Sequence, residues 1–496
     1  MDTTDTLVKE DSLDPVDWKA LRSLGHRMLD DMFTYLETVR ERPVWKKPTS
    51  YAISSMQQPL PLFPQDAELV YEEFLTQVLP FNCNNIHPRF WSWVQGTGTA
   101  MGMLADMLAS GMNSNVSIGD HMPMYVEKQV VDWSKEIFGF PATAGGLLVS
   151  GASVANITAL LVARNHFQPD IRQKGLRSAP AQLTMYASSE THSCLMKAAE
   201  VIGIGSEHFR RVPVDEQYRI QPELLREMIS KDKAAGFIPF CVVGNAGTVN
   251  TGAIDDLEAL GTIAREENCW FHVDGAFGAI PKLLPEYDEI LSGIEMADSL
   301  AFDFHKWFYV NYEVAAVLIR NGRLQREAFA APASYLSMHE RGLSGGPDPF
   351  SNYGMELSRG FKALKVWMLL KEHGLHKYAE LVRQNILQAR YLGSLIEETE
   401  GLELLADIPL NIVCYRYNPG QLDNDQLNRL NKEILMRLQE EGIAAPSYTL
   451  LGGRYAIRVA ITNHRSRRAD FDLLVEASRR IGNDVLQTNS LIHEKK

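Results

Sequence analysis

The stretch SLAFDFHKWFYV, residues 299–310, carries an aspartate, a histidine and a lysine in close succession in a run that is otherwise mostly apolar and aromatic. The part SLAFDF has the composition of a strand that enters a protein interior. Asp303, His305 and Lys306 lie at or just after its end. A buried strand that ends on a lysine suggests a specific role for that lysine, and the neighbouring runs indicate the sheet to which the strand belongs.

Seven short β-rich runs alternate with helical runs between about residue 145 and residue 320. The predicted strands are GLLVS, QLTMYAS, HFRRVPV, PFCVVGNAG, CWFHVDGA, SLAFDF and VAAVLI, and the predicted helices cover residues 153–166, 192–203, 222–235 and 255–267. This alternation favours an α/β fold with a mainly parallel seven-stranded sheet flanked by helices. Ligands of such sheets bind at the carboxyl ends of the strands, where Lys306 is expected.

Two further parts are predicted outside this region. Residues 1–88 contain a helix that we expect to begin at Asp14 as N-cap, with Pro15 in its first turn, and then proline-rich sequence with little core of its own. Residues 376–496 combine helical patterns with the strands LNIVCYRY and RYAIRVAIT. We therefore expect an N-terminal helical arm that packs on a partner subunit, a large domain at residues 89–375 and a smaller C-terminal α/β domain.

The composition limits the partners and the compartment. The 496 residues carry a net charge of −13 at pH 7 and have a pI near 5.5, which argues against nucleic acid or an anionic membrane as the main partner. No apolar run approaches the length that spans a membrane, and the acidic N-terminus is unlike a targeting signal. The five cysteines lack metal-ligand spacing, so we expect a cytoplasmic protein without a metal.

The segment HVDGA ends another predicted strand and brings Asp274 to its exit in apolar company. Asp274 is either a carboxylate that caps the turn before Gly275 or a functional group at the ligand end of the sheet. His272 and Asp274 also form an H-x-D pair of the kind that binds metals. No further well-spaced His or Cys supports a metal site.

The segment VSGAS turns from a strand into a helix that begins near Ser153. Free backbone N–H groups at such a helix start bind anions, phosphate above all. The segment is also close to the G-x-S-x-G nucleophile elbow, so a serine hydrolase that uses Ser153 with Asp274 and His464 is an alternative. A dinucleotide site is not favoured, because no glycine pattern here has the required spacing.

Lys306 distinguishes between these alternatives. Phe304, Trp307 and Phe308 are its neighbours in sequence, and we expect them to remove water from the amine, which favours its neutral form. A neutral amine can form a Schiff base with an aldehyde. Together with a phosphate-binding helix start and the carboxylate of Asp274, it makes up the groups that pyridoxal phosphate needs, whereas a hydrolase leaves the lysine without a role.

Eight segments occur in this chain in the order of one known family: HPRFWSWV, LADMLASGMN, VSGASVANITALLVARN, THSCLMKAAEVIG, DKAAGFIPF, GNAGTVNTGAIDDL, WFHVDGAFG and ADSLAFDFHKW. By these segments the chain resembles the group II pyridoxal-phosphate-dependent amino-acid decarboxylases, closest to the aromatic-L-amino-acid decarboxylase branch. The resemblance implies fold type I and pyridoxal 5'-phosphate as the cofactor. It also implies a homodimer with the active site at the subunit interface.

The resemblance assigns roles to individual residues. Lys306 would hold the cofactor as an internal aldimine, Asp274 would pair with its pyridine nitrogen, and His192 would stack on its ring and help to seat the substrate carboxylate. The other implied cofactor contacts are Ala152 and Ser153 at the phosphate, Thr248 as a hydrogen-bond partner, Ala276 against the ring, and Asp303 and His305 near the phosphate end. Some family members have asparagine where this chain has Asp303.

The implied reaction removes CO2 from an L-amino acid through a quinonoid and gives an amine. Tyr335, in a Gly-, Ser- and Pro-rich stretch typical of a mobile loop, would donate the proton to Cα. Relatives that make aldehydes tend to replace this tyrosine or the stacking histidine, so an aromatic aldehyde synthase is the alternative. The expected substrate is aromatic (tryptophan, tyrosine, phenylalanine, DOPA or a hydroxylated relative), and the residues predicted on its side are Trp91, Trp93, Gly96, Asn115, Ser117 and His192.

Overall fold

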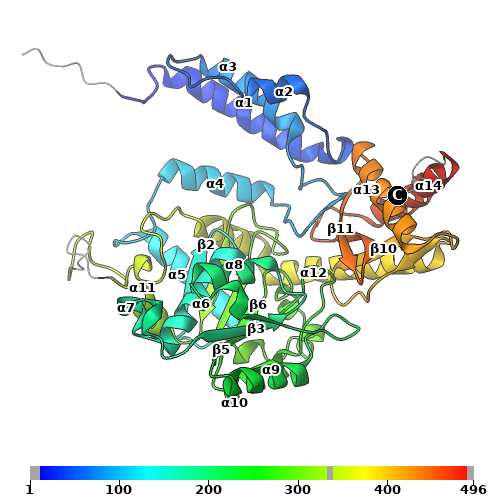
Figure 1. Cartoon of the computed structure of the whole chain (residues 1–496). Coiled ribbons are helices and arrows are strands. Elements are labelled where there is room, and N and C mark those ends of the chain that lie inside the picture. Colours follow the sequence, from blue (N-terminus) through cyan, green and yellow to red (C-terminus); the bar gives the residue numbers. More distant parts are fainter. Residues whose placement is uncertain (1–11, 332–338, 489–496) are drawn as a thin grey trace, which may run out of the picture.

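The computed structural model describes residues 12–331 and 339–488, and a seven-stranded sheet forms its centre (Figure 1). The strand order is β2-β8-β7-β6-β5-β3-β4, and only β8 runs antiparallel to its neighbours in this sheet. The strands are β2 (Gly145–Val149), β3 (Leu183–Ser188), β4 (Phe209–Val212), β5 (Ile238–Asn245), β6 (Trp270–Asp274), β7 (Ser299–Asp303) and β8 (Ala315–Ile319). Each coincides with one of the predicted runs, although β2 and β5 begin one residue earlier than predicted, so the predicted mainly parallel sheet is confirmed.

Helices cover both faces of this sheet, which explains why its inner strands are almost completely buried, whereas the edge strand β4 carries two arginines. On one face pack α6 (Ala152–Phe167), α8 (Ser193–Val201) and α11 (Gly322–Phe329). On the other pack α5 (Met122–Phe138), α9 (Pro222–Ala234), α10 (Leu257–Glu266) and α12 (Ala363–Glu398). The predicted helices α6, α8, α9 and α10 are confirmed; α7 (Ile171–Lys174) is a short addition after α6.

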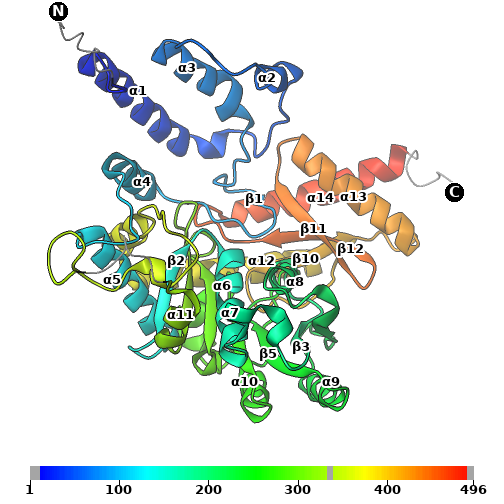
Figure 2. The same ribbon diagram turned by 60° about the vertical axis from the view of Figure 1, so that its left-hand side comes forward.

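The N-terminal arm consists of α1 (Trp18–Glu37), α2 (Ser50–Ser55) and α3 (Ala67–Glu73). It projects from the rest of the chain on the side of α4 (Ala100–Met112), as Figures 1 and 2 show. The predicted start of its first helix is wrong. Asp17, not Asp14, is the N-cap, because its side chain accepts hydrogen bonds from the backbone of Lys19 (2.9 Å) and Ala20 (3.0 Å).

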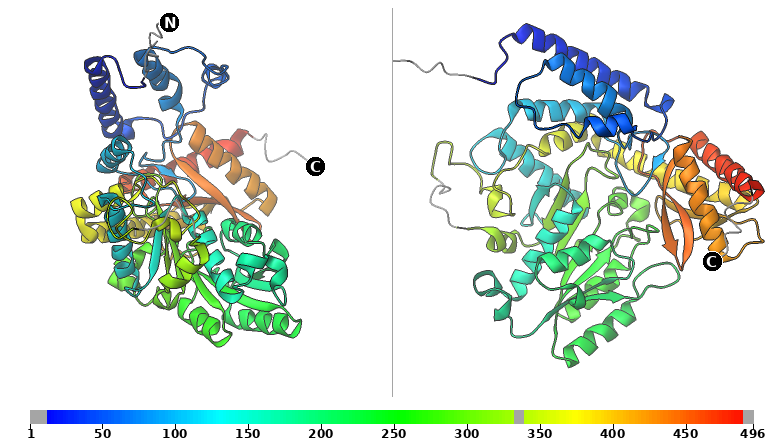
Figure 3. Two further views of the ribbon diagram at one scale, coloured as in Figure 1. Left: turned by 90° about the vertical axis from the view of Figure 1, so that its left-hand side faces the viewer. Right: turned by 45° about the horizontal axis from the view of Figure 1, so that its top comes forward.

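A second, five-stranded sheet has the order β1-β11-β12-β10-β9. Its strands are β1 (Phe90–Trp91), β9 (Leu402–Leu404), β10 (Ile412–Tyr417), β11 (Ala445–Leu451) and β12 (Arg454–Ala460), and α13 (Asn424–Glu440) and α14 (Arg468–Thr488) pack on it. Helix α12 runs from the large sheet to this smaller part, as the right view of Figure 3 shows. Gly374 interrupts α12 with a positive φ of 70°, next to the predicted domain boundary.

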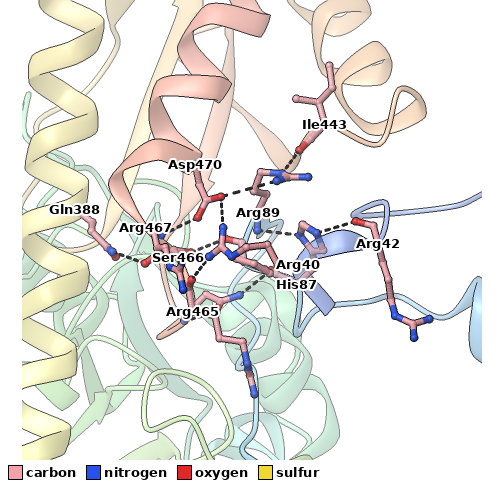
Figure 4. A network of polar contacts seen from close by, with 12 residues as sticks. Arg40, Arg42, His87, Arg89, Gln388, Ile443, Arg465, Ser466, Arg467 and Asp470 are labelled. Carbon is pink, nitrogen blue, oxygen red and sulfur yellow. Dashed lines mark hydrogen bonds and ion pairs between the residues drawn. The ribbon is translucent and has the colours of Figure 1, made fainter. Parts of the chain in front are cut away.

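Polar contacts fasten the base of the arm to the smaller part (Figure 4). Arg40 donates to Asp470 at 2.7 Å, and Arg89 donates to the carbonyl oxygen of Ile443 at 2.6 Å. The residues directly after Arg89 form β1, which joins the smaller sheet by pairing in parallel with β11. The segment after β1 is thereby held between the two sheets, where the functional site lies.

Candidate active site

A cavity of about 480 Å³ lies at the carboxyl ends of β5, β6 and β7, facing the smaller sheet. Most of the residues singled out from the sequence line it: Trp93, Ala152, Ser153, His192, Asp274, Ala276, Asp303, His305 and Lys306. Strands β11 and β12 contribute Ser447, Tyr448 and Arg458 from the opposite side. The site is thus built between the two sheets, at the sheet edge where parallel α/β folds bind ligands.

Lys306 follows β7 and forms an ion pair with Asp303, with Nζ 2.7 Å from Oδ2. Burial lowers the pKa of this amine, but the nearby carboxylates of Asp303 and Asp274 outweigh burial and raise it. The expectation of a neutral amine boxed by aromatic rings is therefore wrong for this structure. Phe304, Trp307 and Phe308 are buried in the core, where their rings pack on other core residues.

Asp303 connects the lysine to the start of α6. Its Oδ1 accepts a hydrogen bond from the backbone N–H of Ala152 at 2.7 Å, while Oδ2 pairs with Lys306. His305 Nε2 lies 3.6 Å from Asp303 Oδ1. Burial lowers the pKa of the His305 ring, although the Asp303 carboxylate opposes this. Asp303 thus serves both a helix N-terminus and a lysine, which explains how a carboxylate is tolerated there.

Asp274 ends β6 with its carboxylate at the buried side of the cavity. Oδ1 accepts from the backbone N–H of Ala276 at 3.1 Å, and Oδ2 accepts from Asn156 Nδ2 at 3.2 Å. Burial raises the pKa of Asp274, and the positive charge of Lys306 partly opposes this. Asp274 therefore caps the turn with one oxygen, which confirms the first interpretation of HVDGA, and it also lines the cavity, where a functional role is compatible with its position.

His192 is the N-cap of α8, and its Nδ1 accepts a hydrogen bond from the backbone N–H of Cys194 at 3.2 Å. Burial lowers the pKa of its ring, so the imidazole is neutral near pH 7. A neutral ring that lines the cavity can stack on a flat ligand. No group of three or more His, Cys, Asp or Glu in residues 12–331 and 339–488 is placed to hold a metal ion.

Three predicted site residues do not line the cavity. Trp91 is in the core of the smaller part, where its ring stacks on Phe471 with centroids 5.0 Å apart. Thr248 is buried in its own turn, and its hydroxyl bonds Thr251 at 3.2 Å. Gly96 packs against the lysine backbone, where an added Cβ would lie 2.6 Å from the carbonyl oxygen of Lys306.

Asn115 and Ser117 do not line the cavity. Asn115 Oδ1 accepts from the backbone N–H of Arg359 at 2.9 Å, and Ser117 is buried beside the same segment. Tyr335, the predicted proton donor, lies outside the residues that the structure describes.

The family model described as "Pyridoxal-dependent decarboxylase conserved domain" matches residues 50–418. The chain is 32% identical over 450 residues to the aromatic-L-amino-acid decarboxylase of Bacillus atrophaeus, which covers 90% of this chain and 92% of that protein. It is 29% identical over 460 residues to the phenylacetaldehyde synthase of Arabidopsis thaliana, covering 90% and 93%. Its fold matches a crystal structure of Oryza sativa TDC with PLP and tryptamine at a TM-score of 0.88 and 23% identity, over 96% of this chain and all of that one.

The chain belongs to the pyridoxal-dependent decarboxylase family. The predicted family and fold type I are confirmed, and this protein is an amino-acid decarboxylase that depends on pyridoxal phosphate.

The cavity of this decarboxylase fits the cofactor in three ways. The amine of Lys306 is available to its aldehyde, and the carboxylate of Asp274 to its pyridine nitrogen. The N–H group of Ser153, in the first turn of α6, has no acceptor within the helix and can bind the phosphate. The hydrolase alternative is not supported, because His464 bonds Thr97 at 2.9 Å and does not line the cavity with Ser153.

Arg458 is a cavity residue of this decarboxylase that sequence reasoning missed. It lies on β12, is 3% exposed, and donates to the carbonyl oxygens of Trp93 (2.7 Å), Val249 (2.6 Å) and Asn250 (3.0 Å). Burial lowers the pKa of its guanidinium group to about 10. Arg458 thereby joins two segments that frame the cavity, one at Trp93 and one at residues 249–250. An arginine inside the apolar strand RYAIRVAIT was the available signal.

Two aromatic side chains of the decarboxylase face the cavity with much of their surface exposed. Trp93 is 60% exposed and has a positive φ of 55°, a conformation that is strained for a residue other than glycine. Its N–H donates to Ser447 Oγ at 3.1 Å and its carbonyl accepts from Arg458, so both neighbours hold this conformation. Tyr448, on β11, is 58% exposed. Sequence reasoning missed it, because β11 was not recognised as a strand.

Proposed function

We propose that this decarboxylase converts an aromatic L-amino acid to the corresponding amine and CO2. The observation that carries the proposal is that Trp93 and Tyr448 present exposed aromatic surface in the same cavity as Lys306. Aromatic substrates bind well between such rings, because stacking adds to the burial of apolar surface. The name of the Bacillus atrophaeus relative, an aromatic-L-amino-acid decarboxylase, points the same way.

In this proposal, four cavity residues have one task each. Lys306 holds the cofactor covalently, the Asp274 carboxylate keeps a proton on the pyridine nitrogen, and the amide of Ser153 binds the phosphate. Bound pyridoxal phosphate supplies an electron-withdrawing ring that accepts the electrons of the broken Cα–carboxylate bond. His192 orients the substrate carboxylate so that this bond can break. The buried setting of Asp274 excludes water and strengthens its interaction with the ring.

The substrate class is tested by incubating the purified holoenzyme with the aromatic amino acids, L-DOPA and 5-hydroxytryptophan, and with glutamate and lysine as controls. Released CO2 and amine are measured together. We expect amine from one or more aromatic substrates, and a lower kcat/KM for them in Tyr448→Ala. CO2 release from glutamate or lysine alone would contradict the aromatic assignment while leaving the decarboxylase assignment intact.

The product is tested separately, since an aromatic aldehyde synthase is the second candidate and one relative is named phenylacetaldehyde synthase. We propose that Tyr335 protonates Cα and thereby commits the reaction to the amine. Tyr335→Phe is expected to shift the product from amine towards aldehyde and ammonia. Unchanged amine output from this variant would remove Tyr335 from the mechanism, and aldehyde from the unaltered enzyme would favour the synthase.

We further propose a homodimer in which a second copy of this chain covers the arm. Trp18, Leu21 and Met28 lie at helical spacing on α1 and are 60%, 43% and 36% exposed. An apolar stripe on an arm that stands away from the rest of the chain suits a subunit interface (Figure 2). Sedimentation should give a dimer, and Leu21→Glu combined with Met28→Glu should weaken it, whereas Ile290→Glu on the large domain should not. A folded and active monomer would refute the proposal.

The proposed compartment is the cytoplasm. All five cysteines are free thiols in the structure and four of them are buried, which suits a reducing environment. No helix in the described part of the chain is long and apolar enough to cross a membrane. Fractionation of the native host with an antibody against this protein tests the location, and recovery outside the cytoplasm would contradict it.

A further inference from the structure

A group of buried polar side chains lies behind Asp274. Trp270, His272 and Asp274 project from the same face of β6, because side chains alternate along a strand. Ser299 is the partner of His272 on the neighbouring strand β7, and Asn156 approaches from α6, which covers this face. His272, Asn156 and Ser299 are completely buried, so their hydrogen-bonding groups depend on one another.

These groups form one continuous chain of hydrogen bonds that ends at the carboxylate. Trp270 Nε1 lies 2.7 Å from Ser299 Oγ, and Ser299 Oγ lies 2.8 Å from His272 Nδ1. On the other side of the ring, His272 Nε2 lies 2.8 Å from Asn156 Oδ1. Asn156 Nδ2 then donates to Asp274 Oδ2 at 3.2 Å.

The chemistry of Trp270 and Asp274, at its two ends, fixes the direction in which this row of hydrogen bonds donates. The indole N–H of Trp270 can only donate, so Ser299 accepts from it and its hydroxyl hydrogen is available to His272 Nδ1. An ionised Asp274 can only accept, so Asn156 turns its amide nitrogen towards Asp274 and its oxygen towards His272. The His272 hydrogen then lies on Nε2, and every bond donates in the direction of Asp274.

The opposite direction is less favourable. It would require Asn156 to turn its oxygen towards Asp274, which is tolerable only if Asp274 is protonated. His272 would have to move its hydrogen to Nδ1, and the hydroxyl hydrogen of Ser299 would lose the ring as its acceptor. His272 also remains neutral, because burial lowers its pKa to about 3.

We propose that His272 and Asn156 are positioning residues that keep Asp274 ionised and aimed at the ring nitrogen of pyridoxal phosphate. They are needed because burial by itself favours the protonated carboxyl group. A donor on Oδ2 stabilises the ionised form, and the backbone N–H of Ala276 does the same on Oδ1. The inference rests on the proposed pairing of Asp274 with the pyridine nitrogen.

The test compares two cofactors on the apoenzyme: pyridoxal phosphate and its 1-deaza analogue, which has a C–H group in place of the ring nitrogen. Apparent Kd values are measured by absorbance and fluorescence titration for the unaltered protein, His272→Leu and Asn156→Leu. We expect both variants to bind pyridoxal phosphate roughly 10- to 100-fold more weakly, because Asn156→Leu removes the charge-assisted hydrogen bond to Asp274 and His272→Leu removes the group that orients its donor. Binding of the analogue should change less than about threefold.

The control is His87→Leu, which removes a buried, hydrogen-bonded histidine at the base of the arm and should leave both Kd values unchanged. Equal losses for the two cofactors in His272→Leu and Asn156→Leu would overturn the proposal, since a merely structural role does not discriminate between them. Unchanged binding of pyridoxal phosphate would overturn it as well. If His272→Leu does not fold, His272→Gln and Asn156→Ala take its place in the same comparison.

Asp274→Asn separates this inference from the function on which it rests. If Asp274→Asn loses affinity for pyridoxal phosphate but not for the analogue, the pairing of Asp274 with the ring nitrogen stands. An absence of discrimination in His272→Leu would then refute only the role of the hydrogen-bond chain. If Asp274→Asn itself shows no discrimination, the proposed pairing of Asp274 is refuted.

Discussion

Replacing Arg359 by leucine should destabilise the protein strongly, because it leaves a buried carboxylate without its partner. Arg359 is 5% exposed and forms an ion pair with Glu127, which is completely buried. The guanidinium group also donates to the carbonyl oxygens of Val116 and Leu148, both at 2.7 Å. Leu148 lies on β2, three residues before the turn that leads into α6, so this contact supports the expected phosphate site.

The magnitude follows from those contacts. A buried carboxylate that loses its cationic partner costs about 3 to 5 kcal/mol, and each carbonyl that loses a donor costs about 1 kcal/mol. We therefore expect Arg359→Leu to lower the free energy of unfolding by about 5 kcal/mol. Glu127→Leu combined with Arg359→Leu removes the stranded charge and should recover most of that loss, because apolar replacements of buried ion pairs are often neutral.

Urea denaturation followed by fluorescence measures both variants, with Arg383→Leu as the matched control. Arg383 pairs with Glu286 at an exposed position, and such pairs contribute about 1 kcal/mol or less. Burial raises the pKa of Glu127 and Arg359 opposes this, so the single variant should recover stability as the pH falls and Glu127 takes up a proton. The reasoning is refuted if Arg359→Leu is as mild as Arg383→Leu, or if the double variant is as unstable as the single one.

Three further predictions concern the cofactor site and the response to acid. Asp303→Asn removes a carboxylate that raises the pKa of Lys306. At neutral pH the variant apoenzyme should therefore gain the absorbance of bound pyridoxal phosphate, at roughly 410 to 430 nm, faster than the unaltered apoenzyme does. An unchanged rate would count against this role of Asp303. Gly96→Ala should abolish that absorbance in folded protein, since its Cβ would collide with the Lys306 backbone, and a normal spectrum would contradict the packing. Below pH 6.5 each neutral buried histidine should lower the free energy of unfolding by about 1.4 kcal/mol per pH unit, down to its lowered pKa. The reason is that the histidine takes up a proton in the unfolded chain but not in the folded one. Unfolding experiments at pH 7 and pH 5 measure this loss. The histidines concerned are His87 (pKa about 4), His272 (about 3) and His464 (about 3).

The strand ends could be predicted from the sequence, because period-two patterns and the strand-helix alternation are local properties. These patterns placed Asp274 and Asp303 at the ends of two strands, and the structure has them at the ends of β6 and β7. They also placed Lys306 shortly after the strand that ends at Asp303, where the structure has it. Two strands escaped this reasoning: β1 has only two residues, and β11 mixes polar and apolar residues and begins beside Pro446. Both depend on pairing with distant segments, which a local pattern does not contain.

The tryptophans show why side-chain directions were harder to predict. Strand spacing puts Trp91 and Trp93 on one face, but Trp93 adopts a positive φ and ends the strand, so the rings diverge. Trp91 enters the core and Trp93 reaches the cavity. The same limit affected Lys306. Its aromatic neighbours in sequence turn into the core after β7, and its neighbour in space is Asp303.

Asp303 determines how charge is balanced in the site before and after the cofactor binds. In the structure one oxygen pairs with the Lys306 ammonium group, and the other accepts a hydrogen bond from the N–H of Ala152 at the start of α6, beside the expected phosphate site. Binding of an aldehyde to Lys306 changes the first contact, and the arrival of a phosphate brings negative charge near the second. His305 Nε2 lies 3.6 Å from the same Oδ1, so the imidazole borders this space as well. An asparagine would keep the bond to Ala152 without the charge, so the aspartate of this chain adds a negative charge between Lys306 and the start of α6.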